Sequence, residues 1–304
     1  MSKLSLAVDV GRLKLRNPTM NAAGVLGMSP ALLKRVYESG AGAVITKSVG
    51  PKPRKGHVNP TLVSGPYGIL NAMGLPNPGA DYFVDSIKSL KSLGVPVVAS
   101  FFGGSIDEFA SVASTLTEAG ADALELNASC PNVLEELGML ASDCLNVERV
   151  TAAVREVTNL PLFVKLSPNV TDINIIAKAA ESGGADAITA VNTLKGMAID
   201  VDFMKPILSN VTGGLSGPAV KPVGLRCVWE VAQAVDLPVI GCGGITNARD
   251  AVEYLLAGAS AVEIGTAVMT EGMNVYRDIA DGIESYLREH GFGSVKEVIG
   301  LAQR

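Results

Sequence analysis

The sequence predicts a (β/α)8 barrel that occupies the whole chain, and three observations support this fold. One short motif recurs where predicted helices end, a second recurs where predicted strands begin, and the two alternate along 304 residues. The composition also fits, because 48% hydrophobic but only 5% aromatic residues, with 33 glycines, suit a parallel sheet buried on both faces and joined by tight turns. A chain of this length is normal for one such barrel, so we predict a single domain over residues 1–304.

The motif at helix ends contains a glycine and is followed at once by an apolar strand. Glycine readily takes the left-handed conformation that ends many helices, so the motif predicts a helix C-terminus next to a strand. The four copies are Glu38–Val44, Glu118–Leu124, Glu181–Ala187 and Leu256–Val262.

The motif at strand starts contains a proline, which lacks an N–H and is tolerated at the first residue of a strand. Its copies are Gly94–Val98, Asn159–Phe163 and Asp236–Val239, and Asn17-Pro18 is a fourth. Repeated strand–helix units with right-handed crossovers are typical of a barrel, whereas the alternative, a doubly wound sheet, seldom needs eight strands of two alternating kinds. The predicted strands cover residues 19–24, 42–47, 96–101, 122–127, 161–166, 186–191, 238–242 and 261–265.

Two further kinds of segment complete the predicted fold. Leu6–Leu15 alternates about a central glycine and predicts an N-terminal β-hairpin that covers the bottom of the barrel. The intervals 48–80, 128–147 and 193–220, after the second, fourth and sixth strands, are longer than a turn and a helix require. All three follow the C-terminal ends of strands, the face on which barrels carry their active sites. We therefore predict long functional loops there.

Charge and cysteine content exclude several classes of protein. The net charge of −5 and the scattered basic residues do not predict nucleic-acid binding. No apolar run reaches the roughly 18 residues that span a bilayer, and the N-terminus does not predict an export signal. Four cysteines without a Cys-x-x-Cys motif indicate reduced thiols in the cytoplasm and no metal site.

The segment Asn127–Asn132 contains the strongest candidate for chemistry. Cys130 follows directly on the predicted fourth strand, where barrels keep reactive groups, and Asn127 and Asn132 offer amide donors and acceptors to a planar polar ligand. The alternative is a thiol that only packs. We interpret Cys144, Cys227 and Cys242 in that second way.

The other strand ends predict a binding site for a phosphorylated cofactor. Lys47 and Lys165 end apolar strands and need anionic partners if buried; no carboxylate appears at these strand tips, so we expect electron-rich ligand atoms instead of ion pairs. Gly243-Gly244 and Gly265-Thr266 follow the seventh and eighth strands, where barrels bind phosphate through backbone N–H groups. Close helix packing is the alternative role of these glycines.

Seven motifs follow one another along nearly the whole chain: Thr46–Ser48, Asn71–Gly79, Asn127–Asn132, Lys165–Pro168, Asn192–Thr193, Gly214–Gly217 and Gly241–Ile245. Together they resemble dihydroorotate dehydrogenase, and most closely its class 1B catalytic subunit, an FMN-binding barrel. The resemblance implies oxidation of (S)-dihydroorotate to orotate in pyrimidine (UMP) biosynthesis. Class 2 enzymes differ by an added N-terminal segment and a serine base.

The resemblance also implies roles for single residues. Cys130 would take the proton from C5 while the hydride of C6 goes to flavin N5, Lys47 would lie between flavin and substrate, and Lys165 would face the pyrimidine edge of the flavin. The implied FMN contacts are Ala23, Lys47, Ser48, Ser100, Asn127, Lys165, Val191, Gly217, Gly243, Gly244, Gly265 and Thr266. The implied substrate contacts are Lys47, Asn71, Ala72, Met73, Gly74, Leu75, Asn127, Asn132, Asn192 and Thr193.

Three positions depart from the family pattern. Ala23 stands where a serine often contacts the flavin, Ser100 stands where asparagine is frequent, and the segment after Asn132 lacks an expected double glycine. By contrast, His57 is expected to be an exposed loop residue.

The resemblance further implies electron transfer to NAD through a partner subunit with FAD and a 2Fe–2S cluster, in a heterotetramer around a catalytic homodimer. Several alternatives remain open. They are a fumarate-dependent class 1A enzyme, another FMN barrel such as a dihydropyrimidine dehydrogenase, a non-catalytic flavin store, and a non-redox barrel that binds a sugar phosphate.

Overall fold

The computed structural model describes residues 4–129 and 140–304, and its centre is a barrel of eight parallel strands. The strands are β3 (Thr19–Asn21), β4 (Val44–Ile45), β7 (Val97–Phe101), β8 (Ala123–Asn127), β9 (Leu162–Lys165), β10 (Ala187–Ala190), β15 (Val239–Cys242) and β16 (Ala259–Ile264). They pair in the order β3-β16-β15-β10-β9-β8-β7-β4, and a parallel bridge between Met20 and Ala43 brings the first strand beside the last. The predicted barrel and its eight strands are confirmed.

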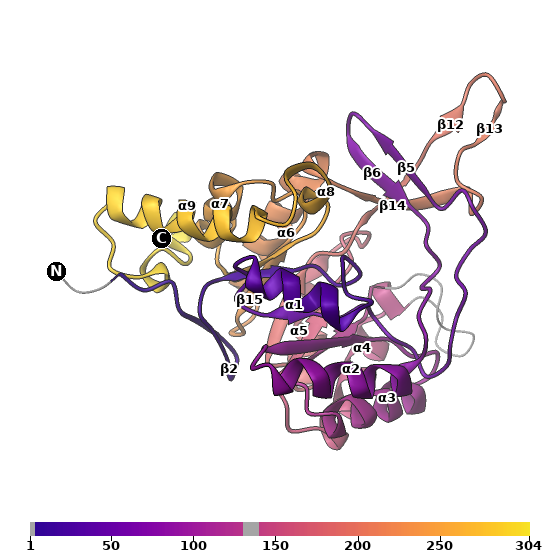
Figure 1. Cartoon of the computed structure of the whole chain (residues 1–304), viewed down its shortest axis with the longest axis horizontal. Coiled ribbons are helices and arrows are strands. Elements are labelled where there is room, and N and C mark those ends of the chain that lie inside the picture. Colours follow the sequence, from indigo (N-terminus) through magenta and orange to yellow (C-terminus); the bar gives the residue numbers. More distant parts are fainter. Residues whose placement is uncertain (1–3, 130–139) are drawn as a thin grey trace.

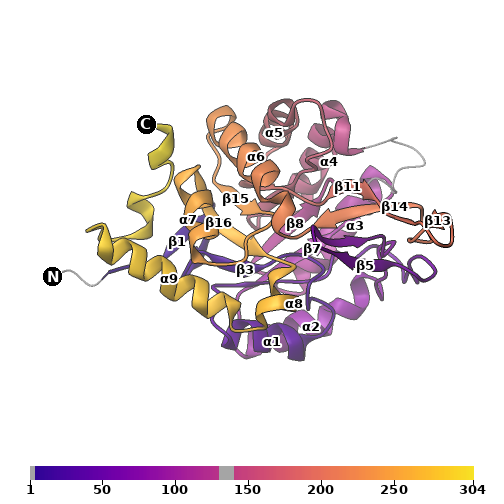
Figure 2. The same ribbon diagram turned by 90° about the horizontal axis from the view of Figure 1, so that it is seen from above.

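Helices follow the barrel strands and surround them (Figure 2). Neighbouring helices pack side by side around the ring: α3 (Ile106–Glu118) packs against α4 (Cys144–Val157), and α4 packs against α5 (Ile173–Ser182). The helices are α1 (Pro30–Glu38), α2 (Ala80–Ser92), α3 (Ile106–Glu118), α4 (Cys144–Val157), α5 (Ile173–Ser182), α6 (Lys221–Ala234), α7 (Ala248–Leu256), α8 (Ala267–Glu271) and α9 (Val275–Glu289). None of those within the described ranges is both long and apolar enough to cross a membrane.

Both recurrent motifs act as the sequence predicted. In the glycine motif, Gly120 and Gly258 have φ of +89° and +113° and end the helices before β8 and β16. In the proline motif, Pro96 and Pro161 stand immediately before β7 and β9, and their carbonyl oxygens accept hydrogen bonds from neighbouring strands. A proline at this place therefore adds an acceptor to the sheet without leaving an unpaired N–H.

The N-terminal hairpin consists of β1 (Val8–Val10) and β2 (Leu13–Leu15), with buried side chains alternating along both strands. In its turn, the guanidinium of Arg12 donates to the carbonyl oxygen of Asn159 at 2.6 Å and lies 3.9 Å from the carboxylate of Asp186. Both partners precede the barrel strands β9 and β10. The hairpin therefore covers the bottom of the barrel, as predicted.

The segments 48–80 and 193–220 are not simple loops, which the sequence did not predict. Each forms antiparallel strands, and the two segments pair with each other in a second sheet of order β11-β14-β6-β5. A two-stranded hairpin projects beyond this sheet (Figure 1) and exposes Phe203 and Met204 at its tip. The strands are β5 (Leu62–Gly65), β6 (Gly68–Asn71), β11 (Leu194–Met197), β12 (Ile199–Asp200), β13 (Lys205–Pro206) and β14 (Thr212–Ser216).

Candidate active site

The C-terminal ends of the barrel strands gather polar residues at one face. Asn127 and Lys165 are the last residues of β8 and β9, while Lys47 and Ser48 follow β4 and Asn192 follows β10. Asn127, Lys165 and Ser48 are buried, and Lys47 and Asn192 are half-buried. Because the strands are parallel, residues from distant parts of the sequence meet at this single face.

A series of side-chain hydrogen bonds joins these strand ends. Asn192 Nδ2 donates to Ser129 Oγ at 2.5 Å, and Ser129 Oγ donates to Asn127 Oδ1 at 2.6 Å. Asn127 Nδ2 in turn donates to Ser48 Oγ at 3.3 Å. The structure thus brings together three residues predicted for the site. Ser129 was missed, although its place inside the Asn127–Asn132 motif could have indicated it.

The same series continues from the rim into the barrel. Ser48 Oγ lies 2.9 Å from Ser100 Oγ, and Ser100 Oγ donates to Glu125 Oε1 at 3.1 Å. Thr189 Oγ1 donates to the other oxygen of Glu125 at 3.2 Å. We call Asn192, Ser129, Asn127, Ser48 and Ser100 the polar series, and it ends on a fully buried carboxylate.

Lys165 has anionic protein partners, so the expectation that only ligand atoms would face it was wrong. Its Nζ donates to Glu263 Oε2 in a short contact and lies 3.9 Å from Glu125 Oε2. The exposed fractions of Glu125, Lys165 and Glu263 are 0%, 3% and 1%, so water does not compensate these charges. The three residues form what we call the acid–lysine cluster.

These two carboxylates were not expected from the sequence because neither of them lies at a strand tip. Glu125 and Glu263 lie before the ends of β8 and β16, inside the runs Leu-Glu-Leu and Val-Glu-Ile. Long side chains from different strands meet inside a closed barrel, so a carboxylate below the rim still reaches the lysine. A lone acidic residue in each apolar strand was the available signal.

Burial and neighbouring charges define the protonation of this region. Burial by itself lowers the pKa of Lys165, but Glu125 and Glu263 outweigh that effect and the pKa lies above its ordinary value. Lys165 is therefore a cation at neutral pH. Burial raises the pKa of the nearby Cys242 thiol to about 12, so Cys242 is neutral.

The predicted substrate segment 71–75 is held by β6 and by His57. Asn71 ends β6, and its Nδ2 donates to the carbonyl oxygen of Gly214 in β14 at 3.3 Å. His57 donates its backbone N–H to Met73 O at 3.0 Å and places Nδ1 3.1 Å from Ala72 O. His57 is a loop residue as expected, but it is half-buried against this segment, so the expectation that it is exposed was wrong.

Thr193 reaches the same region from the other long segment. A Cβ on Gly214 would lie 2.0 Å from Thr193 Oγ1, so only glycine allows this close approach. The second sheet therefore brings Asn71 and Thr193 to the same strand, β14, although they are far apart in sequence. Gly74 and Leu75 continue the segment with φ of +72° and +56°.

Glycines after β15 form a cradle beside the first residue of α6. Gly244 has φ of +70°, and a Cβ there would lie 2.6 Å from the backbone N of Lys221. The ammonium of Lys221 is paired with Asp250 at 2.7 Å and with Glu253 at 3.0 Å. Barrels bind phosphate through backbone N–H groups at glycine turns in this place, and the nearest lysine here is already paired with carboxylates.

Tyr254, which the sequence reading did not single out, supports this cradle. Its Oη donates to the carbonyl oxygen of Gly243 at 2.6 Å. A Cβ on Gly224 or on Gly241 would lie within 2.4 Å of the tyrosine side chain, so both glycines make room for it. Tyr254 fixes the peptide between Gly243 and Gly244. The glycines Gly224, Gly241 and Gly243 in the sequence could have indicated that a large side chain packs against them.

The remaining predicted contacts follow the ends of the barrel strands or of β14. Lys47 Nζ would lie 3.2 Å from a Cβ on Gly24, next to half-buried Ala23. Gly265 approaches the segment after β3, since a Cβ on it would meet Ala22 at 3.5 Å. Val191 is buried, Thr266 is half-buried, and Gly217 packs against the turn between β5 and β6. Cys130 and Asn132 lie outside the described residues.

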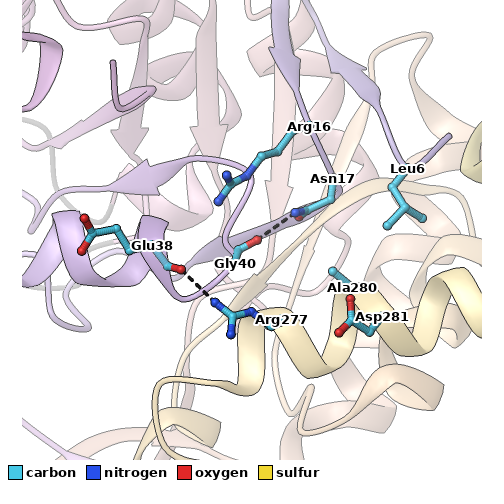
Figure 3. Close-up of a pocket in the computed structure, with 8 residues that line it drawn as sticks. All are labelled: Leu6, Arg16, Asn17, Glu38, Gly40, Arg277, Ala280 and Asp281. Carbon is cyan, nitrogen blue, oxygen red and sulfur yellow. Dashed lines mark hydrogen bonds between the residues drawn. The ribbon is translucent and has the colours of Figure 1, made fainter. Parts of the chain in front are cut away.

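A pocket of about 320 Å³ lies at the opposite end of the barrel, beside the N-terminal ends of β3 and β4 (Figure 3). Both arginines in its lining form hydrogen bonds with the backbone: Arg277 donates to the carbonyl oxygen of Glu38, and Arg16 donates to those of Tyr37 and Ala41. These contacts satisfy carbonyl groups at and after the end of α1. We therefore assign this pocket a structural role and place the candidate active site at the other face.

The fold and this face together define a (β/α)8-barrel protein with a ligand site at the C-terminal ends of its strands. A family profile for dihydroorotate dehydrogenase matches residues 5–287. This chain belongs to that family.

Individual relatives match over almost their full lengths. The chain is 52% identical over 298 residues to the protein of Pyrococcus abyssi named dihydroorotate dehydrogenase B (NAD(+)), catalytic subunit, which covers 98% of this chain and 99% of the relative. A protein of the same name from Methanosarcina acetivorans is 51% identical over 292 residues, covering 95% and 94% of the two chains. The predicted resemblance to class 1B is confirmed.

Proposed function

We propose that this chain is the catalytic subunit of an NAD-linked dihydroorotate dehydrogenase that oxidises (S)-dihydroorotate to orotate in UMP biosynthesis. The observation that carries the proposal is the polar series at the barrel rim, in a chain that matches this family over residues 5–287. Asn127 and Asn192 offer amide groups to the two amide edges of the substrate ring. In this proposal residues 1–304 form one cytoplasmic, FMN-binding domain.

The residues of the cradle fit a flavin mononucleotide. Dihydroorotate dehydrogenases are flavin enzymes, and the proposal specifies FMN. Only glycine fits at position 244, because a Cβ added there would collide with the backbone of Lys221. Backbone N–H groups of such a glycine turn suit a phosphate. When bound, FMN supplies the acceptor for the hydride that leaves C6. The proposed phosphate contacts are Gly217, Gly243, Gly244, Gly265 and Thr266.

The protein side chains supply the remaining chemistry of the proposed reaction. Lys165, held as a cation within the acid–lysine cluster, would stabilise negative charge that develops on the ring beside it. Lys47 and the N–H groups of residues 73–75 bind the substrate carboxylate, and Cys130 removes the proton from C5. Asn71, Asn132 and Thr193 complete the substrate site.

The names of the relatives support the proposed electron acceptor. They specify NAD(+) and a catalytic subunit, which indicates that those proteins work with a partner subunit. We place FAD and a 2Fe–2S cluster in that partner, in a heterotetramer around a catalytic homodimer.

Anaerobic stopped-flow absorbance tests the proposal. Dihydroorotate should bleach the bound flavin, whereas dihydrouracil, which lacks the carboxylate, should not. A colourless protein that takes up no flavin would overturn every redox function, and bleaching by dihydrouracil alone would indicate a dihydropyrimidine dehydrogenase. Steady turnover with fumarate as the only acceptor would instead support class 1A.

The cradle gives a separate prediction for Gly244→Ala. The added methyl must lie where φ is +70° and where the backbone of Lys221 is 2.6 Å away, so we expect FMN affinity to fall about tenfold or more. Flavin fluorescence titration of the apoprotein measures this affinity. Gly94→Ala is the matched control, because Gly94 has the same φ and no atom within 4 Å of its Cβ position. Equal FMN affinities in the two variants would contradict the assignment.

A further inference from the structure

The acid–lysine cluster contains one more acid than base. Glu125 and Glu263 come from strands that three others separate in the barrel, yet both face Lys165. All three residues are almost completely buried. An uncompensated ionised group in such a place costs several kcal/mol. Two ionised carboxylates with one ammonium would leave such a charge, which a proton on one carboxyl group removes.

Hydrogen bonding distinguishes the two carboxyl groups. Glu125 accepts from Ser100 on one oxygen and from Thr189 on the other, as an ionised carboxylate does. Glu263 Oε2 accepts from Lys165, but its Oε1 is buried and has no hydrogen-bond partner as a carboxylate. An acceptor left in this state is costly, whereas a protonated carboxyl group can donate to a neighbour.

The direction of the polar series agrees with this distinction. With an ionised Glu125, Ser100 gives its only hydroxyl proton to that carboxylate and Ser48 donates to Ser100. Ser48 itself accepts from Asn127. Every donor of the polar series then points toward Glu125, so the whole series is consistent with a negative charge on that residue.

We propose that Glu263 holds a proton at neutral pH and, as a neutral acid hydrogen-bonded to Glu125, is the positioning residue for Lys165. The cluster is then neutral overall, with one carboxylate for one ammonium. This inference rests on the proposed function, in which Lys165 faces the flavin. A lysine that is fixed in position, and whose charge one carboxylate compensates, exposes the cofactor to the same local charge throughout the reaction.

The titratable groups around Glu263 support the assignment. They are Glu125 on β8, Lys165 on β9 and Cys242 on β15. Burial raises the pKa of Glu263 well above its usual value, Glu125 raises it further, and Lys165 opposes them. The Cys242 thiol is neutral and adds no charge.

Infrared difference spectroscopy of the flavin-bound protein tests for the proton. Wild type minus Glu263→Gln should show the C=O band of a buried carboxylic acid, which shifts in D2O. Glu230→Gln is the matched control, since Glu230 is partly exposed on α6 beside Arg226, and its spectrum should keep the band. Absence of an acid band from wild type would overturn the proposal.

Flavin binding then shows which carboxyl group is the acid. Glutamine copies a protonated glutamate in shape and charge, so Glu263→Gln should keep FMN affinity and the ratio of affinities for reduced and oxidised FMN within about twofold. Glu125→Gln removes the ionised member, and its FMN affinity should fall at least tenfold. The reverse pattern would assign the proton to Glu125 and overturn the proposal.

The flavin midpoint potential provides a further decisive outcome. If Glu263 is ionised in the wild type, Glu263→Gln removes a negative charge beside Lys165. The preference for reduced FMN would then rise tenfold or more, about 30 mV for a two-electron couple, and the proposal would fail. Protein that binds no flavin at all would contradict the proposed function, while the infrared band would still decide the proton.

Discussion

Lys165→Met is expected to lower the free energy of unfolding by about 3–5 kcal/mol at pH 7, the usual cost of removing one partner from a buried ion pair. Methionine preserves most of the volume of the lysine stem but leaves Glu125 and Glu263 without their cation. The hydroxyl donors Ser100 and Thr189 remain for Glu125 only. Urea unfolding followed by circular dichroism measures the change.

The loss should depend on pH in a definite direction. Burial and then Glu125 hold the folded-state pKa of Glu263 well above the unfolded value of about 4.3, and Lys165 opposes them, so without Lys165 that pKa moves further up. A group with a raised folded-state pKa contributes stability that is complete below the unfolded pKa and is lost as pH rises through the folded one. The deficit of Lys165→Met should therefore be smallest at acid pH and should grow as the pH rises through the folded-state pKa of Glu263 in the wild type.

Lys34→Met is the matched control for this prediction. Lys34 forms an exposed pair with Glu38 one turn along α1, at 3.0 Å. Such a pair contributes roughly 0.3–0.5 kcal/mol, so its loss should be small and nearly independent of pH between 5 and 8. Equal stabilities of the two variants at pH 7 would show that the acid–lysine cluster does not stabilise the barrel as described.

Cys130→Ser is expected to slow flavin reduction by dihydroorotate by about 10² to 10⁴-fold at neutral pH while leaving FMN bound. A free thiol has a pKa of about 8.5 and ionises appreciably near neutrality, whereas a serine hydroxyl does not. The reductive half-reaction, followed by stopped-flow absorbance over pH 6–10, measures both the rate and its pH dependence. In the wild type the rate should rise with pH as the thiol ionises.

Cys144→Ser serves as the control for the base. Cys144 is a partly buried free thiol at the first residue of α4, and our interpretation gives it a packing role. Its variant should reduce flavin at the wild-type rate. If Cys130→Ser did so too, another residue would have to remove the C5 proton.

The barrel was predictable because local chemistry marks its element boundaries. A glycine such as Gly120 at a helix end and a proline such as Pro161 before a strand act within a few residues, so they are visible without knowledge of the fold. The second sheet was not predictable in this way. Asn71 and its partner Gly214 are 143 residues apart, in short strands with several glycines. Alternation of apolar and polar residues in one segment does not identify the segment that pairs with it.

The candidate site was predicted in part for a similar reason. Residues at strand ends, such as Asn127 and Asn192, follow from the position of the strands. Glu125, Glu263 and Tyr254 act across the barrel or against a neighbouring loop, and their partners are defined only after the ring closes. A single charged residue in an otherwise apolar strand, such as Glu125 or Glu263, predicts a partner of opposite charge on another strand.

The pairing of β6 with β14 has a consequence for redesign and for evolution of this enzyme. Asn71 and Thr193 reach the site from different segments, but the register Gly214↔Asn71 makes one segment a template for the other. If either segment alone were replaced by the matching segment of a relative, its side chains would pack against a partner segment from a different protein. The two segments should therefore be exchanged together, as a single cassette, and substitutions in them should accumulate in matched pairs.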